Sequence, residues 1–168
     1  LKPTNGTGDL TFSRASSATR VNEQGLIEEA SVISPTELVT NGSFTGGTTS
    51  WLLDSGWLYN SNNVQFTHSG ATNRDLYQNS VLTIGSFYKI EYTISSSSLV
   101  GSMSIPQGDI SLLTTNGTHI AYFEANQTRL AIRVVSSTSG SIIVDNVSVK
   151  EVITSNVPRI DYTNGCGS

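Results

Sequence analysis

The sequence is poor in cysteine, in charge and in long apolar runs. Its one cysteine, Cys166, excludes an intrachain disulfide and a cysteine-rich metal site, so packing has to stabilise the fold. Charged residues make up 13% of the chain, and 9 Lys and Arg against 13 Asp and Glu give a net charge of −4. So few basic residues leave no electrostatic footprint for nucleic acid. No apolar run approaches the roughly 18 residues that span a bilayer, so we expect no membrane insertion.

Catalytic motifs are missing as well. The two histidines, His68 and His119, lie far apart in the sequence and do not have the spacing of zinc ligands. There is no G-x-S-x-G turn and no glycine-rich phosphate loop. The acidic residues could supply the two carboxylates of a glycosidase, but none lies in a motif linked to that chemistry. We therefore expect binding rather than catalysis.

Serine, threonine, asparagine and 15 glycines dominate what is present, and apolar residues alternate with polar ones. The alternation is clearest over residues 88–94 (YKIEYTI), which predicts a half-buried strand. Turn-forming clusters separate further candidate strands and helical signals are nearly absent, so we expect an all-β fold, an antiparallel β-sandwich of jelly-roll type. The other predicted strands are residues 9–14, 37–40, 64–67, 119–125, 129–135, 141–144 and 147–151.

Two parts of the chain differ in composition. Compact mixed-charge motifs occupy residues 1–33 and 156–168, whereas residues 34–155 form a long array rich in Ser, Thr and Gly. We place domain boundaries near Pro35 and Asn156. Because the chain begins with Leu1 and ends without a terminating element, we also expect it to be a processed product or a piece of a longer protein.

Three ordered motifs stand in the two outer segments: residues 12–21 (FSRASSATRV), residues 25–27 (GLI) and residues 156–162 (NVPRIDY). Together they resemble a module of structural proteins of tailed bacteriophages, in which the same motifs follow one another almost directly. The resemblance implies a fibre, tail or head-decoration protein, commonly homotrimeric and exposed on the outside of the virion.

The intervening segment has a different resemblance. It opens with residues 37–44 (ELVTNGSF), continues with Trp51 and Trp57, and closes with residues 143–149 (IVDNVSV). In this pattern it is similar to carbohydrate-binding modules with a jelly-roll fold. The two resemblances together imply a carbohydrate-binding-like domain, residues 34–155, inserted into a small β-rich host module, residues 1–33 and 156–168.

An insertion requires the ends of the inserted domain to meet, which predicts that Ser34 and Ser155 lie close together. Arg14, Arg159 and Asp161 belong to the host module, where an ion pair would tie its two halves together. The alternative is a contact between subunits of a trimer, and the sequence does not choose between the two.

Three aromatic residues, Trp51, Trp57 and Tyr59, are the candidates for glycan binding. Aromatic faces stack on the apolar faces of sugar rings, and these residues lie close together in a region rich in turns. The competing interpretation is core packing, which for Trp51 means a position beneath Phe44. For Trp57 and Tyr59 core packing and glycan binding are equally supported. For Tyr77 and Tyr122 we favour core packing.

A structural calcium ion is implied by the second resemblance. Backbone carbonyls at Asn41 and Ser43, with the side chain of Glu37 or Asp145, could supply hard oxygen ligands. The match is incomplete because Thr45 and Asn146 stand where such modules often carry acidic residues. The alternative is that Asp145 and Asn146 form a turn between two strands.

The leading functional hypothesis is a bacteriophage virion protein, of tail-fibre or head-decoration type, that attaches to glycans of the bacterial surface. It would act non-covalently, as a homotrimer among other virion proteins on the outside of the particle. A spacer or capsid-decoration domain without a ligand is the first alternative. The second is an accessory binding module of a secreted polysaccharide-degrading enzyme, which would be extracellular. The sequence identifies neither the glycan nor the bacterium.

Overall fold

The computed structural model of the chain describes residues 18–21, 27–67, 72–136 and 139–153. Contacts between Cα atoms divide the chain into two units, one of residues 34–152 and one of residues 1–33 with 153–168. The described residues form strands and no helix, so the all-β prediction is confirmed. Accordingly, this part of the chain offers no helix capable of crossing a membrane.

The described part of the smaller unit contains a short antiparallel hairpin. Strand β1 (Ala18–Val21) pairs with β2 (Ile27–Ala30), and Ala18 lies opposite Ala30. Strand β3 (Val32–Ile33) follows. The predicted strand at residues 9–14 lies outside the described residues.

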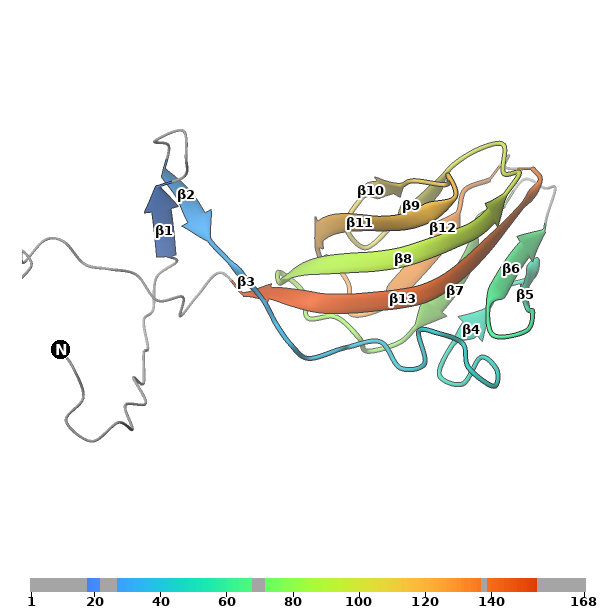
Figure 1. The fold of residues 1–168 in the computed structure, drawn as a ribbon, viewed down its shortest axis with the longest axis horizontal. Helices are drawn as coiled ribbons and strands as arrows, with labels where there is room; N and C mark the ends of the chain where they lie inside the picture. The colour runs from blue at the N-terminus through green and yellow to red at the C-terminus, as the bar shows by residue number, and fades with distance from the viewer. Residues whose placement is uncertain (1–17, 22–26, 68–71, 137–138, 154–168) are drawn as a thin grey trace, which may run out of the picture. The chain divides into compact units, whose positions relative to one another are not determined.

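The larger unit is a sandwich of two antiparallel sheets (Figure 1). We name each sheet after a central strand. The β7 sheet has the order β10-β9-β12-β7-β4 and the β8 sheet has the order β11-β8-β13-β6-β5. The strands of the β7 sheet are β4 (Leu52–Leu53), β7 (Arg74–Gln78), β9 (Met103–Ile105), β10 (Ile110–Leu112) and β12 (Leu130–Val134). Those of the β8 sheet are β5 (Trp57–Tyr59), β6 (Val64–Thr67), β8 (Phe87–Ser97), β11 (Gly117–Glu124) and β13 (Ser141–Ile153).

The chain crosses from one sheet to the other at most of its turns, which makes the sandwich a jelly roll as predicted. Consecutive strands pair within one sheet only as β5 with β6 and β9 with β10 among these ten strands. Neighbours in each sheet therefore come mostly from distant parts of the sequence. Residues that share a face must be found from the strand register and not from the sequence spacing.

The hydrophobic core lies between the two sheets. Along β8 the side chains of Tyr88, Ile90, Tyr92 and Ile94 are buried and those between them are not, which confirms the predicted alternation. Burying one large apolar side chain contributes about 1.5–3 kcal/mol, so the core supplies the stability that disulfides do not. Other core residues from both sheets include Phe66, Leu76, Met103, Ile105, Phe123, Leu130, Ile132, Ile142, Val144 and Val149.

Two of the predicted strands are in fact one. Residues 141–144 and 147–151 both belong to β13, and the register of β13 against β8 shifts between Asp145 and Ser148. Asn146 has a φ of 50°, and its amide donates to Oδ1 of Asp145 (2.7 Å). The two residues thus form a bulge within a strand and not a turn between strands.

Residues 37–40 are not a strand, contrary to the prediction, because their backbone is bonded in another way. The carboxylate of Glu37 accepts hydrogen bonds from the amides of Leu38 and Val39 (both 3.1 Å). Next to this segment, the carbonyl of Gly42 accepts from the amide of Val147 (2.9 Å) in the β13 bulge. A Cβ atom at Gly42 would lie 1.8 Å from the Val147 carbonyl oxygen, so only glycine fits.

The two ends of the larger unit lie side by side. The amide of Ser34 donates to the carbonyl of Glu151 (2.8 Å), and that of Leu38 donates to the carbonyl of Val149 (3.0 Å). The first residues of the unit therefore run antiparallel to the end of β13. Ser155, the second residue of the predicted close pair, lies outside the described residues.

Candidate functional site

The two tryptophans proposed as glycan ligands are core residues. Trp51 is 5% exposed, packs against Phe44 with ring centroids 5.2 Å apart, and donates from its indole to the carbonyl of Asn41 (3.0 Å). Trp57 is 2% exposed, packs against Phe66 and donates to the carbonyl of Arg74 (3.3 Å). Neither indole offers a face on which a sugar ring could stack.

Tyr59 is the only one of the three candidates that reaches the surface, where it is 43% exposed. Its hydroxyl is within hydrogen-bonding distance of Oδ1 of Asn62 (3.1 Å), which also accepts from the amide of Gly46 (3.1 Å). The ring is thus held by a loop rather than set among other binding groups.

The carboxylate of Glu37 and the carbonyl of Asn41, both proposed as calcium ligands, already have protein partners. Oε1 of Glu37 also accepts from the amide of Val149 (2.8 Å), and Oε2 accepts from the hydroxyl of Ser148 (2.5 Å). The carbonyl of Asn41 accepts from Phe44 and Trp51. A carboxylate surrounded by N–H and O–H donors does not present its lone pairs to a cation, so this arrangement does not fit a calcium site.

Of the remaining calcium candidates, Asp145 accepts from the amide of Asn146 through Oδ1. Ser43 was proposed through its backbone carbonyl, and its hydroxyl pairs with that of Thr45 (2.9 Å). Within the described ranges there is no group of three or more His, Cys, Asp or Glu residues that could hold a metal ion. The opening and closing motifs do meet in space, as the calcium hypothesis required, but hydrogen bonds and the contact at Gly42 join them. Arg14, Arg159 and Asp161 lie outside the described residues.

A different set of polar residues gathers on the outer face of the β7 sheet. The strand register forms two rows across this face: Leu52, Tyr77 and Ala131 in one, and Asp75, Arg133, Ser104 and Ser111 in the other. Side chains directly opposite each other in antiparallel strands share one face of a sheet. We call these seven residues, together with Arg129, the β7 face.

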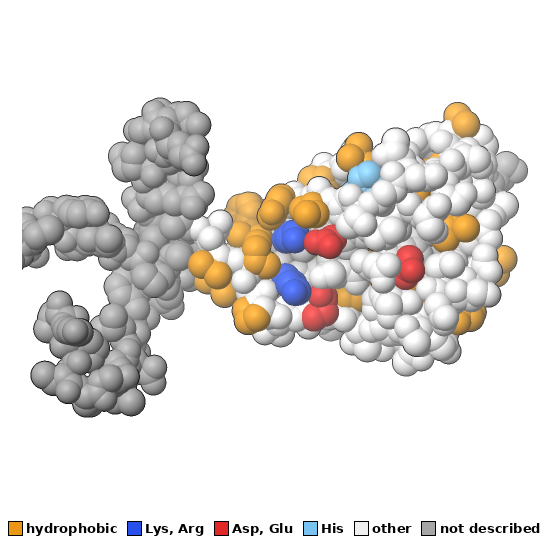
Figure 2. Space-filling view, in the orientation of Figure 1, with side chains coloured by type: hydrophobic (Ala, Val, Ile, Leu, Met, Phe, Trp, Pro, Cys, Tyr) orange, Lys and Arg blue, Asp and Glu red, His pale blue; other side chains and the backbone are white. Residues whose placement is uncertain are grey.

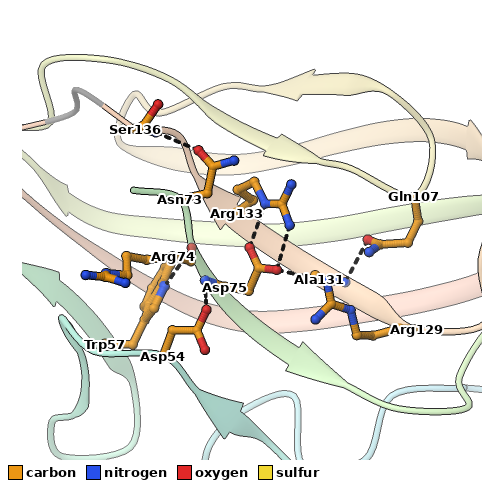
Figure 3. A network of polar contacts seen from close by, with 10 residues as sticks. All are labelled: Asp54, Trp57, Asn73, Arg74, Asp75, Gln107, Arg129, Ala131, Arg133 and Ser136. Atoms are coloured by element: carbon orange, nitrogen blue, oxygen red, sulfur yellow. Dashed lines mark hydrogen bonds and ion pairs between the residues drawn. The ribbon is translucent and has the colours of Figure 1, made fainter. Parts of the chain in front are cut away.

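Asp75 is the centre of the β7 face, although its side chain is only 7% exposed. Arg133 binds it with two parallel bonds, from Nε to Oδ1 (2.7 Å) and from Nη2 to Oδ2 (2.9 Å), and Nη2 of Arg129 also reaches Oδ2 (2.9 Å) (Figure 3). The hydrogen bonds to Asp75 raise the pKa of Arg133 above its ordinary value, against the opposing effect of burial. The carboxylate therefore fixes both guanidinium groups in place.

Tyr77 adds an aromatic ring to this face. The guanidinium carbon of Arg129 lies 4.8 Å from the centroid of the ring, a cation–π distance. Tyr77 is half-buried, and its partner across the strand pair, Leu52, is 46% exposed. An aromatic ring, an exposed apolar side chain and two fixed guanidinium groups thus lie together on one sheet.

The loop between β9 and β10 supports the same face from one side. Gln107 is fully buried, and its Oε1 accepts from the amide of Ala131 (2.9 Å), which belongs to the same row as Tyr77 (Figure 3). Gly108 follows, where a Cβ atom would lie 2.4 Å from that of Phe123. The loop is therefore packed tightly against the sandwich, which keeps the backbone of β12 fixed.

The outer face of the β8 sheet has a different character, and Figure 2 shows apolar, Lys and Glu side chains gathered on it. Phe87, Ile120 and Tyr122 are 47%, 51% and 59% exposed. Lys89 lies between Tyr122 and Lys150 in the register and pairs with Glu91 (2.9 Å). The hydrogen bond to Glu91 raises the pKa of Lys89. We call these six residues the β8 face.

Sequence reasoning did not find Asp75, Arg129 and Arg133. Arg129 and Arg133 lie 54 and 58 positions after Asp75 in the sequence, and the pairing of β12 with β7 brings them together. One signal was available, since strand β7 (RDLYQ) carries charged and amide residues where buried strands are usually apolar. For Tyr77 and Tyr122 core packing was expected, but Tyr77 is half-buried on an outer face and Tyr122 is exposed.

Comparison with known proteins gives structural likeness only. No protein-family model matches the chain, and no curated protein matches it. Among solved structures, one described as "CBM4 structure and function" is similar with 12% identity and a TM-score of 0.42, over 67% of this chain and 98% of that one. The CBM22-1 xylan-binding domain of Paenibacillus barcinonensis Xyn10C has 10% identity and a TM-score of 0.43, over 69% and 94% of the two chains.

A third similar structure is the secreted serine protease VesC from Vibrio cholerae, with 14% identity and a TM-score of 0.41 over 76% of this chain and 30% of that one. At such identities the likeness concerns the course of the backbone. It transfers neither a ligand nor an activity to this chain.

Proposed function

We propose that this chain is a non-catalytic glycan-binding part of a tailed-bacteriophage virion protein, of tail-fibre or head-decoration type. In this proposal residues 34–155 are a carbohydrate-binding-like jelly roll inserted into a host module formed by residues 1–33 and 156–168. The protein assembles as a homotrimer with other virion proteins on the outside of the particle and attaches it to glycans of the bacterial surface.

The observation that carries the glycan-binding role is the β7 face. Tyr77 and Leu52 offer apolar surface for the C–H face of a sugar ring, while Arg129 and Arg133 offer fixed donors to its hydroxyl groups. Ser104 and Ser111, each with a hydroxyl group, continue the row that contains Arg133. Few of these groups need to be ordered on binding, because Asp75 already holds the two arginines.

Two observations support the rest of the proposal. The ordered motifs at residues 12–21, 25–27 and 156–162 support the phage module. The hydrogen bond between Ser34 and Glu151 supports an insertion, because a domain whose ends are adjacent disturbs a surface loop little. Individual sites of this kind bind weakly, and the copy number on a particle multiplies them.

Binding of the full chain to an array of bacterial surface glycans tests the proposal. We expect binding that is lost in Tyr77→Ala and kept in Tyr122→Ala, which removes a tyrosine from the outer face of the other sheet. Circular dichroism and thermal unfolding establish that both variants fold, and no new reducing ends should appear on incubation. Equal losses in the two variants, or binding by neither variant nor the parent chain, would count against the β7 face as a glycan site.

A structural role without a ligand is the second candidate, and the β8 face favours it. Three large apolar side chains exposed on one sheet are typical of a surface that another subunit covers. Sedimentation of the full chain distinguishes the two functions. A stable oligomer that dissociates in Tyr122→Thr, together with no glycan binding, would favour the spacer.

A further inference from the structure

The β7 face carries more positive than negative charge, although the chain as a whole is acidic. Arg129 and Arg133 share the single carboxylate of Asp75. Among the described residues, Asp75 is thus the only carboxylate bonded to the two arginines, which leaves one positive charge in surplus within the β7 face. The nearby Asp54 accepts from the amide of Asp75 (2.9 Å) and acts on Arg133 only through its charge, and Arg74 pairs with the core residue Val134 on the other side of β7. The net charge of the whole chain is −4, so this surplus is a local feature.

The positive groups, and not the negative one, are the groups that solvent can reach. The side chains of Arg129 and Arg133 are 31% and 27% exposed, against 7% for Asp75. A guanidinium has five N–H donors, and Asp75 takes two from Arg133 and one from Arg129. Within the described part of the chain, Nη1 of neither arginine has a hydrogen-bond partner. Donors therefore remain on a surface that is already rigid.

From these observations we propose that the β7 face selects acidic glycans, in which a pyranose ring carries a carboxylate. The sugar carboxylate would bind the free N–H groups of Arg129 and Arg133, since the planar guanidinium matches a carboxylate in geometry and charge. The apolar face of the ring would pack on Tyr77 and Leu52. This inference rests on the proposed glycan-binding function and specifies the ligand class of the same site.

Asp75 has a positioning role in this proposal. It holds the two guanidinium groups side by side, so a ligand carboxylate meets both without further ordering of long side chains. It also neutralises only one of the two positive charges of the arginines, and a ligand carboxylate can neutralise the other. A neutral sugar could use the same donors but would leave the charge uncompensated.

The test uses polymers that differ only in charge. Alginate, homogalacturonan and hyaluronan are each compared with their carboxyl-reduced forms, which keep the linkages and replace the uronate by a neutral hexose. We expect the full chain to bind at least one acidic polymer about tenfold or more tightly than its reduced form, as a lost charge-assisted contact predicts. Added salt should weaken binding of the acidic form more than that of the reduced form.

Two variants locate the effect. Arg129→Gln keeps both hydrogen bonds between Arg133 and Asp75, so the fold should survive. The variant should bind the acidic polymer about tenfold or more weakly and the reduced polymer with unchanged affinity. Lys89→Gln removes one positive charge from the outer face of the other sheet and should leave affinity unchanged. Thermal unfolding checks that both variants are folded.

The outcomes separate this inference from the function on which it rests. Equal binding of acidic and reduced polymers, or binding to neutral glycans alone, overturns the preference for acidic sugars and leaves the glycan-binding function standing. Equal losses in Arg129→Gln and Lys89→Gln overturn the assignment to the β7 face. Binding to no polymer and to no glycan of the array counts against both.

Discussion

The outer faces of the two sheets use polar residues in opposite ways. On the β7 face the charged groups hold one another, since a nearly buried Asp75 joins Arg129 to Arg133, and the aromatic ring of Tyr77 lies beneath one of them. On the β8 face apolar side chains are exposed to solvent, and the ion pair of Lys89 with Glu91 joins two residues of the same strand, with the Glu91 side chain 42% exposed. A fixed polar network suits a small polar ligand, whereas an exposed apolar surface suits a protein neighbour.

The largest expected difference between the faces is in stability. Asp75→Ala leaves two partly buried guanidinium groups without a counter-charge, so we expect a loss of about 2–4 kcal/mol in the free energy of unfolding. Glu91→Ala is the matched change on the β8 face and should cost at most about 1 kcal/mol, because the Glu91 carboxylate is 42% exposed, against 7% for Asp75, and has a single ion-pair partner. Chemical denaturation of both variants measures the two values. Equal losses would remove the contrast between the faces.

Alkaline pH should act on the β8 sheet through its inward side. Burial raises the pKa of Tyr92 to about 12, and its hydroxyl donates to the carbonyl of Leu113 (2.9 Å). Between the ordinary tyrosine pKa of about 10 and this value, the unfolded chain loses a proton that the folded chain keeps, so stability falls as pH rises. The fall is about 1.4 kcal/mol per pH unit for this one group.

Denaturation at several pH values between 9 and about 12 measures this dependence, with Tyr92→Phe as the control. The variant should lose this part of the slope, whereas its stability at neutral pH should fall by only about 1 kcal/mol for the missing hydrogen bond. An unchanged slope in the variant would assign the alkaline sensitivity to other groups.

The smallest expected effect concerns the apolar side chains of the β8 face. The double substitution Phe87→Thr with Tyr122→Thr keeps residues that favour strands, so stability should change by about 0.5 kcal/mol or less. Self-association, measured by sedimentation, should decrease. A large loss of stability without any change in association would show that the two rings pack within the subunit.

Much of the fold followed from sequence patterns, whereas the site did not. Residues 88–94 alternate strictly because one face of β8 meets the core, and the alternation predicted the strand. The tryptophans could not be assigned, since a large aromatic ring near turns suits both a core and a binding surface, and here both pack inside. Asp75 and Arg133 required the register of β7 against β12, which local patterns do not contain.

The bulge in β13 illustrates the same limit. Asp145 and Asn146 have the composition of a turn, and the positive φ of Asn146 is also typical of one. The bulge forms instead because Val147 turns its amide to Gly42, a residue far away in the sequence. Local composition predicted the break in the ladder but not whether the strand would continue.

The antiparallel pairing of Ser34 and Leu38 with the end of β13 determines how the larger unit would respond to a mechanical load. A pull transmitted along the chain enters and leaves at neighbouring points, so it would open this seam one hydrogen bond at a time. The Glu37 carboxylate, which accepts from Ser148 and Val149, adds two further bonds to this seam. As long as these bonds hold, the tension passes across the seam from one end of the unit to the other, and the strands that carry the β7 face bear no load.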